Sequence, residues 1–134
     1  MTIEIKRLNE NFRMEASNEN GNSIQIDNIA GGEGMSPMQL LLAGIGGCSS
    51  IDIIDILKKQ RQDLKDLKVK VDGQRQKDVV PALFEKIHIH YHFFGNLDEN
   101  KVQRAIKLSL ETYCSVSKML EKTAVVTSSY QIEK

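Results

Sequence analysis

The chain has 134 residues, of which 40% are hydrophobic and 27% are charged, so it is long and apolar enough to bury the core of one domain. Its 18 basic and 18 acidic residues cancel to a formal net charge of zero. That balance gives no electrostatic reason to expect nucleic acid or an anionic membrane as a partner.

The amino-terminal part of the sequence predicts a small antiparallel sheet. Ile3 and Ile5 alternate with charged residues, which is the pattern of a strand. The polar run Asn18–Asn22 contains a glycine and predicts a hairpin turn. The charged residues among the first eight do not fit a secretory leader. We therefore expect three strands near residues 2–7, 12–16 and 24–26, in a soluble, cytoplasmic protein.

A long helix is predicted from the segment SPMQLLLAGIGGCSSIDIIDIL, residues 36–57. Ser36 is a typical N-cap, and Pro37 suits the first helical position because its missing N–H has no partner there in any helix. We expect this helix to end near Gln62. The apolar run 38–51 is too short to span a bilayer. The first half of the helix is apolar on almost every side, so we expect it to be enclosed, on one side by a second copy of the chain.

Three glycines lie within this helix, at positions 44, 46 and 47, directly before Cys48. Each costs about 1 kcal/mol of helix stability relative to alanine. Two interpretations remain open: the glycines allow close packing of helices, or they leave room for a small substrate beside the thiol.

The second half of the sequence adds strands and helices without any linker. Asp98 is a typical N-cap for the first helix of this half. The whole chain is predicted to be one α+β domain, residues 1–134, with the order βββ-α-ββ-αα-β, a mostly antiparallel sheet and helices on one face. The expected elements are strands 64–75 and 84–94, helices 99–113 and 115–122, and strand 124–132.

Cys48 and Cys114 are the candidate reactive groups. Free cysteines are often simply buried apolar residues, and that interpretation stays open for both. Cys114 or Ser115 is expected to begin the short helix, where the positive helix end favours a thiolate, with Lys118 one turn further on.

Three histidines, at positions 88, 90 and 92, alternate along one predicted strand and so share one face. Alternate strand residues are nearly 7 Å apart, which fits a single metal ion poorly. We favour a polar outer sheet face over a metal site, and we predict no cofactor and no metal.

The sequence resembles the OsmC/Ohr superfamily of osmotically inducible and organic-hydroperoxide-resistance proteins. The resemblance covers essentially the whole chain and rests on the segment GMSPMQLLLAGIGGCSSIDIIDIL, on YCSVSKML, and on the strand FEKIHIHYHFFG. It implies an OsmC-like fold in which antiparallel sheets surround long central helices of an intertwined homodimer.

The resemblance also implies an activity, the reduction of organic hydroperoxides in oxidative-stress defence. Cys48 would be the peroxidatic thiol and Cys114 the resolving thiol, and a small dithiol or lipoyl-type reductant would restore both. By the same resemblance, Arg13 would hold the Cys48 thiolate. The family orients that arginine with a glutamate just after the helix-starting proline, where this chain has Met38, and Glu33 is a candidate substitute.

A second hypothesis belongs to a different class of function. In it the chain is a non-catalytic relative that binds a small ligand in a pocket at the dimer interface, and the cysteines serve packing or redox sensing. A disulfide between Cys48 and Cys114 after peroxide treatment, with consumption of the peroxide, would distinguish the two.

Overall fold

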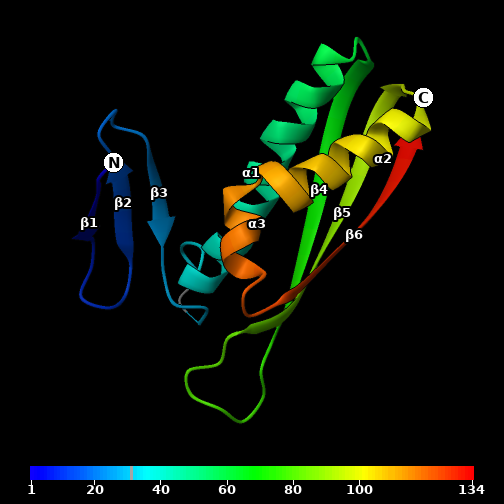
Figure 1. The fold of residues 1–134 in the computed structure, drawn as a ribbon. Coiled ribbons are helices and arrows are strands. Elements are labelled where there is room, and N and C mark those ends of the chain that lie inside the picture. The colour runs from blue at the N-terminus through cyan, green and yellow to red at the C-terminus, as the bar shows by residue number, and fades with distance from the viewer. Residues whose placement is uncertain (31) are drawn as a thin grey trace. The chain divides into compact units, whose positions relative to one another are not determined.

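The computed structural model describes residues 1–30 and 32–134, and its elements follow the predicted order (Figure 1). The chain forms two compact units, Met1–Leu41 and Leu42–Lys134. The α+β class of the prediction is confirmed, with two three-stranded sheets, one in each unit.

The first unit is an antiparallel meander. Its strands are β1 (Ile3–Arg7), β2 (Met14–Asn18) and β3 (Ser23–Ile26), with β2 in the middle. The predicted hairpin turn joins β2 to β3. The Asn18 side chain accepts hydrogen bonds from the backbone N–H groups of Asn20 and Asn22 there, and Gly21 has a φ of 86° that suits glycine.

The second unit contains the longer sheet, with β5 (Phe84–Asn96) at its centre. The strand β4 (Asp63–Arg75) pairs with β5 antiparallel, and β6 (Val125–Glu133) pairs with it parallel. The helices of this unit include most of α1 (Pro37–Lys59), together with α2 (Glu99–Leu108) and α3 (Ser115–Leu120).

The core of the second unit lies between this sheet and its helices. Side chains alternate along β5, so its isoleucines, Tyr91 and Phe93 point to one face and are almost fully buried. That face meets the apolar sides of α1 and α2, while polar residues occupy the other face. The buried helical residues include Ile45, Ile53 and Leu57 of α1 and Val102, Ala105 and Ile106 of α2.

The start of α1 is the capping box that its sequence predicts. The Ser36 hydroxyl accepts from the Gln39 N–H at 3.2 Å, and the Gln39 side chain accepts from the Ser36 N–H at 2.9 Å. The helix ends at Lys59 rather than near Gln62, and Arg61 follows with a positive φ of 57°. By length and composition alone α1 could cross a membrane, with a mean hydropathy of 1.8 in its most apolar part, a test that core helices also pass.

The predicted helix 99–113 is interrupted. Its first part is α2, capped by Asp98 as expected. Its last five residues form a π-helical turn, η1 (Ser109–Tyr113), closed by a 2.7 Å hydrogen bond from the Cys114 N–H to the Ser109 carbonyl. The wider turn changes the direction in which the residues after Leu108 point, and π turns often occur at functional sites.

Candidate thiol site

The two cysteines come from different elements of the second unit. Cys48 is half-buried in the middle of α1, and Cys114 is fully buried at the N-cap of α3. The backbone N–H of Ser117 donates to the Cys114 sulfur at 3.4 Å. Of the two proposed caps for the short helix, the structure selects Cys114.

The side chains of these two cysteines lie close together, and the acidic side chain of Asp52 lies beside them. The sulfur atoms of Cys48 and Cys114 and a carboxylate oxygen of Asp52 all lie within 4.8 Å of one another. Asp52 follows Cys48 by four residues on α1, so the two side chains lie on the same face of the helix. Both cysteines remain free thiols at this separation.

Ser109 fixes Asp52 in this arrangement. Its buried hydroxyl lies 3.0 Å from an Asp52 carboxylate oxygen, to which it donates, and 3.3 Å from the Ser49 carbonyl. Ser109 is the first residue of η1, and Cys114 is the residue directly after that turn. The π turn therefore brings a supporting hydroxyl and a thiol to the same stretch of α1.

The electrostatics of Cys114 differ from the sequence-based expectation. Burial raises the pKa of the Cys114 thiol from its ordinary 9.0 to about 11, and the neighbouring Cys48 and Asp52 add to the rise. The Ser117 N–H acts in the opposite direction without overcoming burial. Lys118 pairs with Glu121 at 3.1 Å. The helix end that favours a thiolate is present at Cys114, but desolvation outweighs it and raises the pKa of the thiol.

A buried hydroxyl pair anchors α1 to the sheet directly beside Cys48. The Tyr91 hydroxyl donates to the Ser49 hydroxyl at 2.6 Å, and the Ser49 hydroxyl is 3.3 Å from the Gly46 carbonyl. Both side chains are fully buried, and burial raises the pKa of Tyr91 to about 12. This contact fixes the position of the helical turn that carries Cys48.

Arg13 lies in the first unit, directly before β2, where its side chain donates to the Gln25 amide oxygen at 2.7 Å. The first turn of α1 contains no acidic residue, in agreement with Met38 at that position. The roles of Arg13 and Glu33 remain predictions.

The three histidines form a polar ladder on the outer face of the longer sheet. His88 contacts Thr127 and Ser129, and His90 contacts Ser129 and Gln131, through both ring nitrogens in each case. His92 pairs with Glu133 at 2.9 Å. Each imidazole is therefore engaged along β6, as the favoured interpretation predicted.

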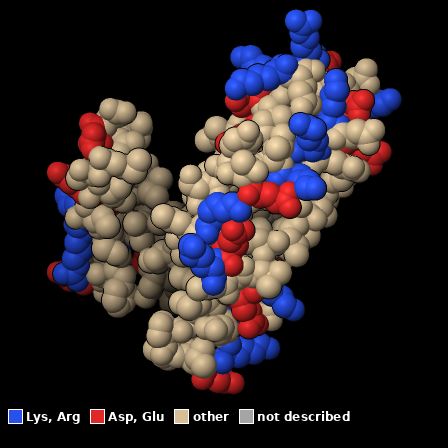
Figure 2. Space-filling model, in the orientation of Figure 1, with Lys and Arg blue, Asp and Glu red and all other residues tan. Residues whose placement is uncertain are grey.

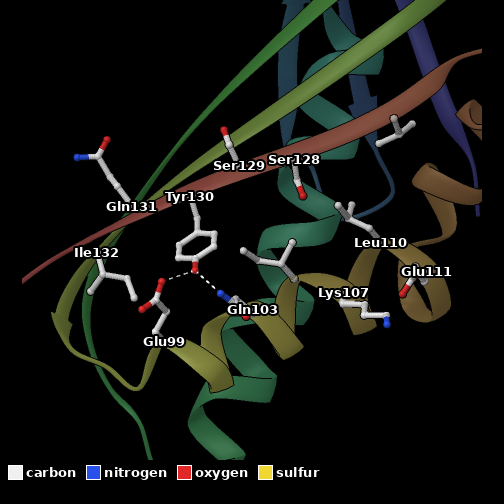
Figure 3. Close-up of a pocket in the computed structure, with 12 residues that line it drawn as sticks. Glu99, Gln103, Lys107, Leu110, Glu111, Ser128, Ser129, Tyr130, Gln131 and Ile132 are labelled. Carbon is white, nitrogen blue, oxygen red and sulfur yellow. Dashed lines mark hydrogen bonds between the residues drawn. The ribbon is translucent and has the colours of Figure 1, made fainter.

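A broad hollow of about 860 Å³ lies between α2, η1 and the inner side of β6 (Figure 3). At one end the Tyr130 hydroxyl donates to Glu99 at 2.7 Å and accepts from Gln103 at 2.6 Å. Neither cysteine lines this hollow. On the face shown in Figure 2, basic and acidic side chains are intermixed, in keeping with the zero net charge.

Three residues of the site were not identified from the sequence, namely Asp52, Ser109 and Tyr91. The four-residue spacing between Cys48 and Asp52 was a visible signal. Nothing in the sequence indicates that Ser109 and Tyr91 reach α1, because both contacts join residues more than 40 positions apart.

Comparison with known proteins places the chain among OsmC-like sequences. The sequence model described as OsmC-like protein matches residues 30–129. The protein YhfA of Escherichia coli K12 is 42% identical over 113 residues, which is 84% of each chain.

Solved structures agree with the fold. A hypothetical protein from Aquifex aeolicus VF5 has a TM-score of 0.84 and 32% identity, covering 99% of this chain and 97% of the other. The organic hydroperoxide resistance protein OhrB of Bacillus subtilis has a TM-score of 0.65 and 20% identity, with 98% of each chain covered. At that identity the second likeness shows the fold alone.

Proposed function

The chain belongs to the OsmC-like protein family, and from this premise we propose that it reduces organic hydroperoxides, with Cys48 as the attacking thiol and Cys114 as the resolving thiol. The observation that carries the proposal is the meeting of the two sulfur atoms, which come from helices far apart in sequence. The choice of substrate class comes from the family resemblance, which includes organic-hydroperoxide-resistance proteins.

The proposed reaction has three balanced steps. The Cys48 thiolate attacks one oxygen of the peroxide, the O–O bond breaks, and the other oxygen leaves as an alkoxide that takes up a proton to become the alcohol. Cys48 is then a sulfenic acid. Cys114 displaces its oxygen as water and forms the disulfide, and a small dithiol reduces that disulfide to two thiols while being oxidised to its own disulfide.

The different burial of the two sulfurs supports this division of roles. Cys48 is half-buried and can be reached from outside, whereas Cys114 is fully buried and its raised pKa keeps the thiol protonated at neutral pH. A peroxide from solution reaches the half-buried Cys48 more readily than the buried Cys114, which suits Cys114 to the second step, where its partner is the neighbouring Cys48. Disulfide formation needs the sulfurs to close from at most 4.8 Å to about 2.05 Å, which a local shift of the short α3 can supply.

Two further parts of the proposal come from the family resemblance. Arg13 would supply the positive charge that holds the Cys48 thiolate. A cytoplasmic location would provide the dithiol or lipoyl-type reductant and keep both cysteines reduced between turnovers.

The test uses reduced protein and cumene hydroperoxide. We expect peroxide consumption and a Cys48–Cys114 disulfide in the mass spectrum. Cys48→Ser should abolish turnover, whereas Cys114→Ser should leave Cys48 open to sulfinic and sulfonic oxidation. Peroxide that persists while Cys48 stays a thiol would refute the proposal, and equal activity of the two variants would refute the division of roles.

A second candidate is a redox-sensing or ligand-binding protein without turnover. The position of Asp52 favours slow, single oxidation over rapid turnover, since its carboxylate adds to the rise in the pKa of the Cys114 thiol. In that case one equivalent of peroxide forms the disulfide, and added dithiol gives no continuous consumption. Multiple turnovers per chain would exclude it.

The proposed assembly is an intertwined homodimer. In the first unit Ile3, Ile5 and Ile24 are exposed around an apolar hollow of about 390 Å³. In the second unit α1 exposes Ile51 and Ile54. Apolar surface of this extent is typical of an interaction site, and the family resemblance supports a second copy as the partner.

A further inference from the structure

Asp52 is a half-buried acidic group that the proposed peroxide chemistry does not use. One of its carboxylate oxygens lies within 4.8 Å of the sulfur atoms of both Cys48 and Cys114. Across residues 1–30 and 32–134, no lysine, arginine or histidine forms an ion pair with it. The hydrogen bond from Ser109 nevertheless holds one carboxylate oxygen in place at 3.0 Å.

We propose that Cys48, Asp52 and Cys114 form a binding site for a thiophilic divalent cation, with Zn²⁺ as the ion that fits the ligand set best. The proposal concerns the reduced protein and does not depend on peroxide turnover.

The spacing of the three ligand atoms suits one ion. Tetrahedral Zn²⁺, with Zn–S near 2.3 Å and Zn–O near 2.0–2.2 Å, holds its ligands roughly 3.5–3.8 Å apart. Both sulfurs and the carboxylate oxygen already lie within 4.8 Å of one another. A small contraction of side chains therefore completes three of four positions, and the fourth stays open to water or an external thiol, as in zinc sites with three protein ligands.

The surroundings support the ligands as they do in known zinc sites. Ser109 orients the Asp52 carboxylate, and the Ser117 N–H donates to the Cys114 sulfur. The ligands come from two fixed points, one turn of α1 and the N-cap of α3. Two thiolates select Zn²⁺ over Mg²⁺ or Ca²⁺, which prefer oxygen ligands.

A carboxylate and two sulfur atoms grouped this closely favour a bound cation. An ion between the three groups neutralises the carboxylate and both sulfurs together. Because the ion and the disulfide use the same sulfur atoms, they exclude one another. Bound Zn²⁺ would therefore protect both cysteines from peroxide, and oxidation would release the ion.

The test is direct binding to the reduced full chain without oxygen or peroxide. Zn²⁺ is titrated against a chromophoric chelator, and Cd²⁺ is used to detect thiolate-to-metal absorption. We expect one ion per chain, loss of at least roughly 100-fold in affinity for Cys48→Ser and for Cys114→Ser, and a loss of about 10–100-fold for Asp52→Asn and for Ser109→Ala.

The matched control is Asp55→Asn, which changes the next acid on α1. Asp55 is exposed, pairs with Lys59 at 2.9 Å, and does not belong to the group formed by Cys48, Asp52 and Cys114. We expect it to bind Zn²⁺ like the wild type. The amide oxygen that Asp52→Asn introduces can still accept the Ser109 hydrogen bond, so this variant should keep its fold, which circular dichroism checks.

The histidine ladder provides the competing assignment. Binding that survives both cysteine substitutions and disappears when His88, His90 and His92 are changed to glutamine would overturn the proposal, as would equal affinity of the Asp52→Asn and Asp55→Asn variants. Zinc binding without peroxide turnover would leave this site standing and refute only the proposed function. Peroxide turnover without zinc binding would refute the zinc site and leave the proposed function standing.

Discussion

The burial of Cys114 supports the proposed division of roles between the two thiols of the site. Its side chain is 0% exposed, and its pKa of about 11 keeps it protonated at neutral pH. Cys48 is half-buried in the same site. In the proposed reaction a peroxide from solution would reach Cys48 before Cys114, so the proposed order of the two steps agrees with the difference in solvent access.

The raised pKa of Cys114 predicts how stability changes at alkaline pH. In the unfolded chain this thiol loses its proton near pH 9, whereas in the folded chain it keeps the proton until about pH 11. Between these values the unfolded state binds fewer protons, so the free energy of unfolding falls as pH rises. The contribution is fully present below pH 9 and is lost as pH rises through 11.

Urea unfolding of wild type and Cys114→Ala at pH 8, 9, 10 and 11 measures this effect. The variant has a lower stability at pH 8 because a buried side chain is shortened, but its decline from pH 9 to 11 should be shallower than that of the wild type. Tyr91, whose pKa is raised to about 12, is present in both proteins and cancels in the comparison. An equal decline in the free energy of unfolding of the two proteins would show that the Cys114 thiol does not cause the pH dependence.

At the residue scale, the sequence indicated which cysteines matter but not what surrounds them. The pairing of Cys48 with Cys114 followed from the family resemblance. Local sequence shows the helix start at Cys114 but not the burial that raises the pKa of its thiol. Ser109 reaches Asp52 only because of the π turn, which no residue pattern announces.

At the scale of elements, local sequence signals predicted where helices start better than where they end. Ser36 and Asp98 cap their helices as expected, because a cap depends on residues next to it in sequence. The helix after Asp98 was expected to be continuous, and it changes to a π turn at Ser109. The mostly antiparallel expectation is confirmed, and the one parallel pairing, of β6 with β5, depends on the path of the intervening helices.

The glycines of α1 have separable packing roles, and Gly46 gives the clearest prediction. A Cβ at this position would lie 2.9 Å from a Val71 methyl carbon on β4. Overpacking of this kind costs about 1–3 kcal/mol, against roughly 1 kcal/mol that alanine adds to a helix. We expect Gly46→Ala to lower the free energy of unfolding, measured with urea.

Gly44→Ala is the matched control on the same helix. Its Cβ would lie 3.7 Å from the nearest side-chain carbon, on Val116, which is an ordinary contact. Here the helix preference should prevail, with a gain of about 0.5–1 kcal/mol. Equal effects of the two substitutions would mean that Gly46 is not required for close packing of α1 on the sheet.

At the scale of the whole molecule, the apolar surface exceeds what a chain of this size needs to leave uncovered. The exposed side chains of the first unit include Ile3, Ile5 and Phe12. On α1, Gly47 lies in open space and Ile51 is 71% exposed one turn later. The expected enclosure of this helix stays a prediction, and its open side is where we expect the second copy.

The proposed homodimer makes Ile51 the most informative surface position. Light scattering coupled to size exclusion should give wild type about twice the 15.1 kDa mass of one chain. Ile51→Lys should shift the mass towards one chain, because a charge would be buried against the partner.

Val80→Lys changes an equally apolar residue that is 99% exposed in the loop between β4 and β5, and it should keep the dimer. A wild type that stays at the mass of one chain at the highest soluble concentration would exclude the assembly, and a dimeric Ile51→Lys variant would move the interface away from α1.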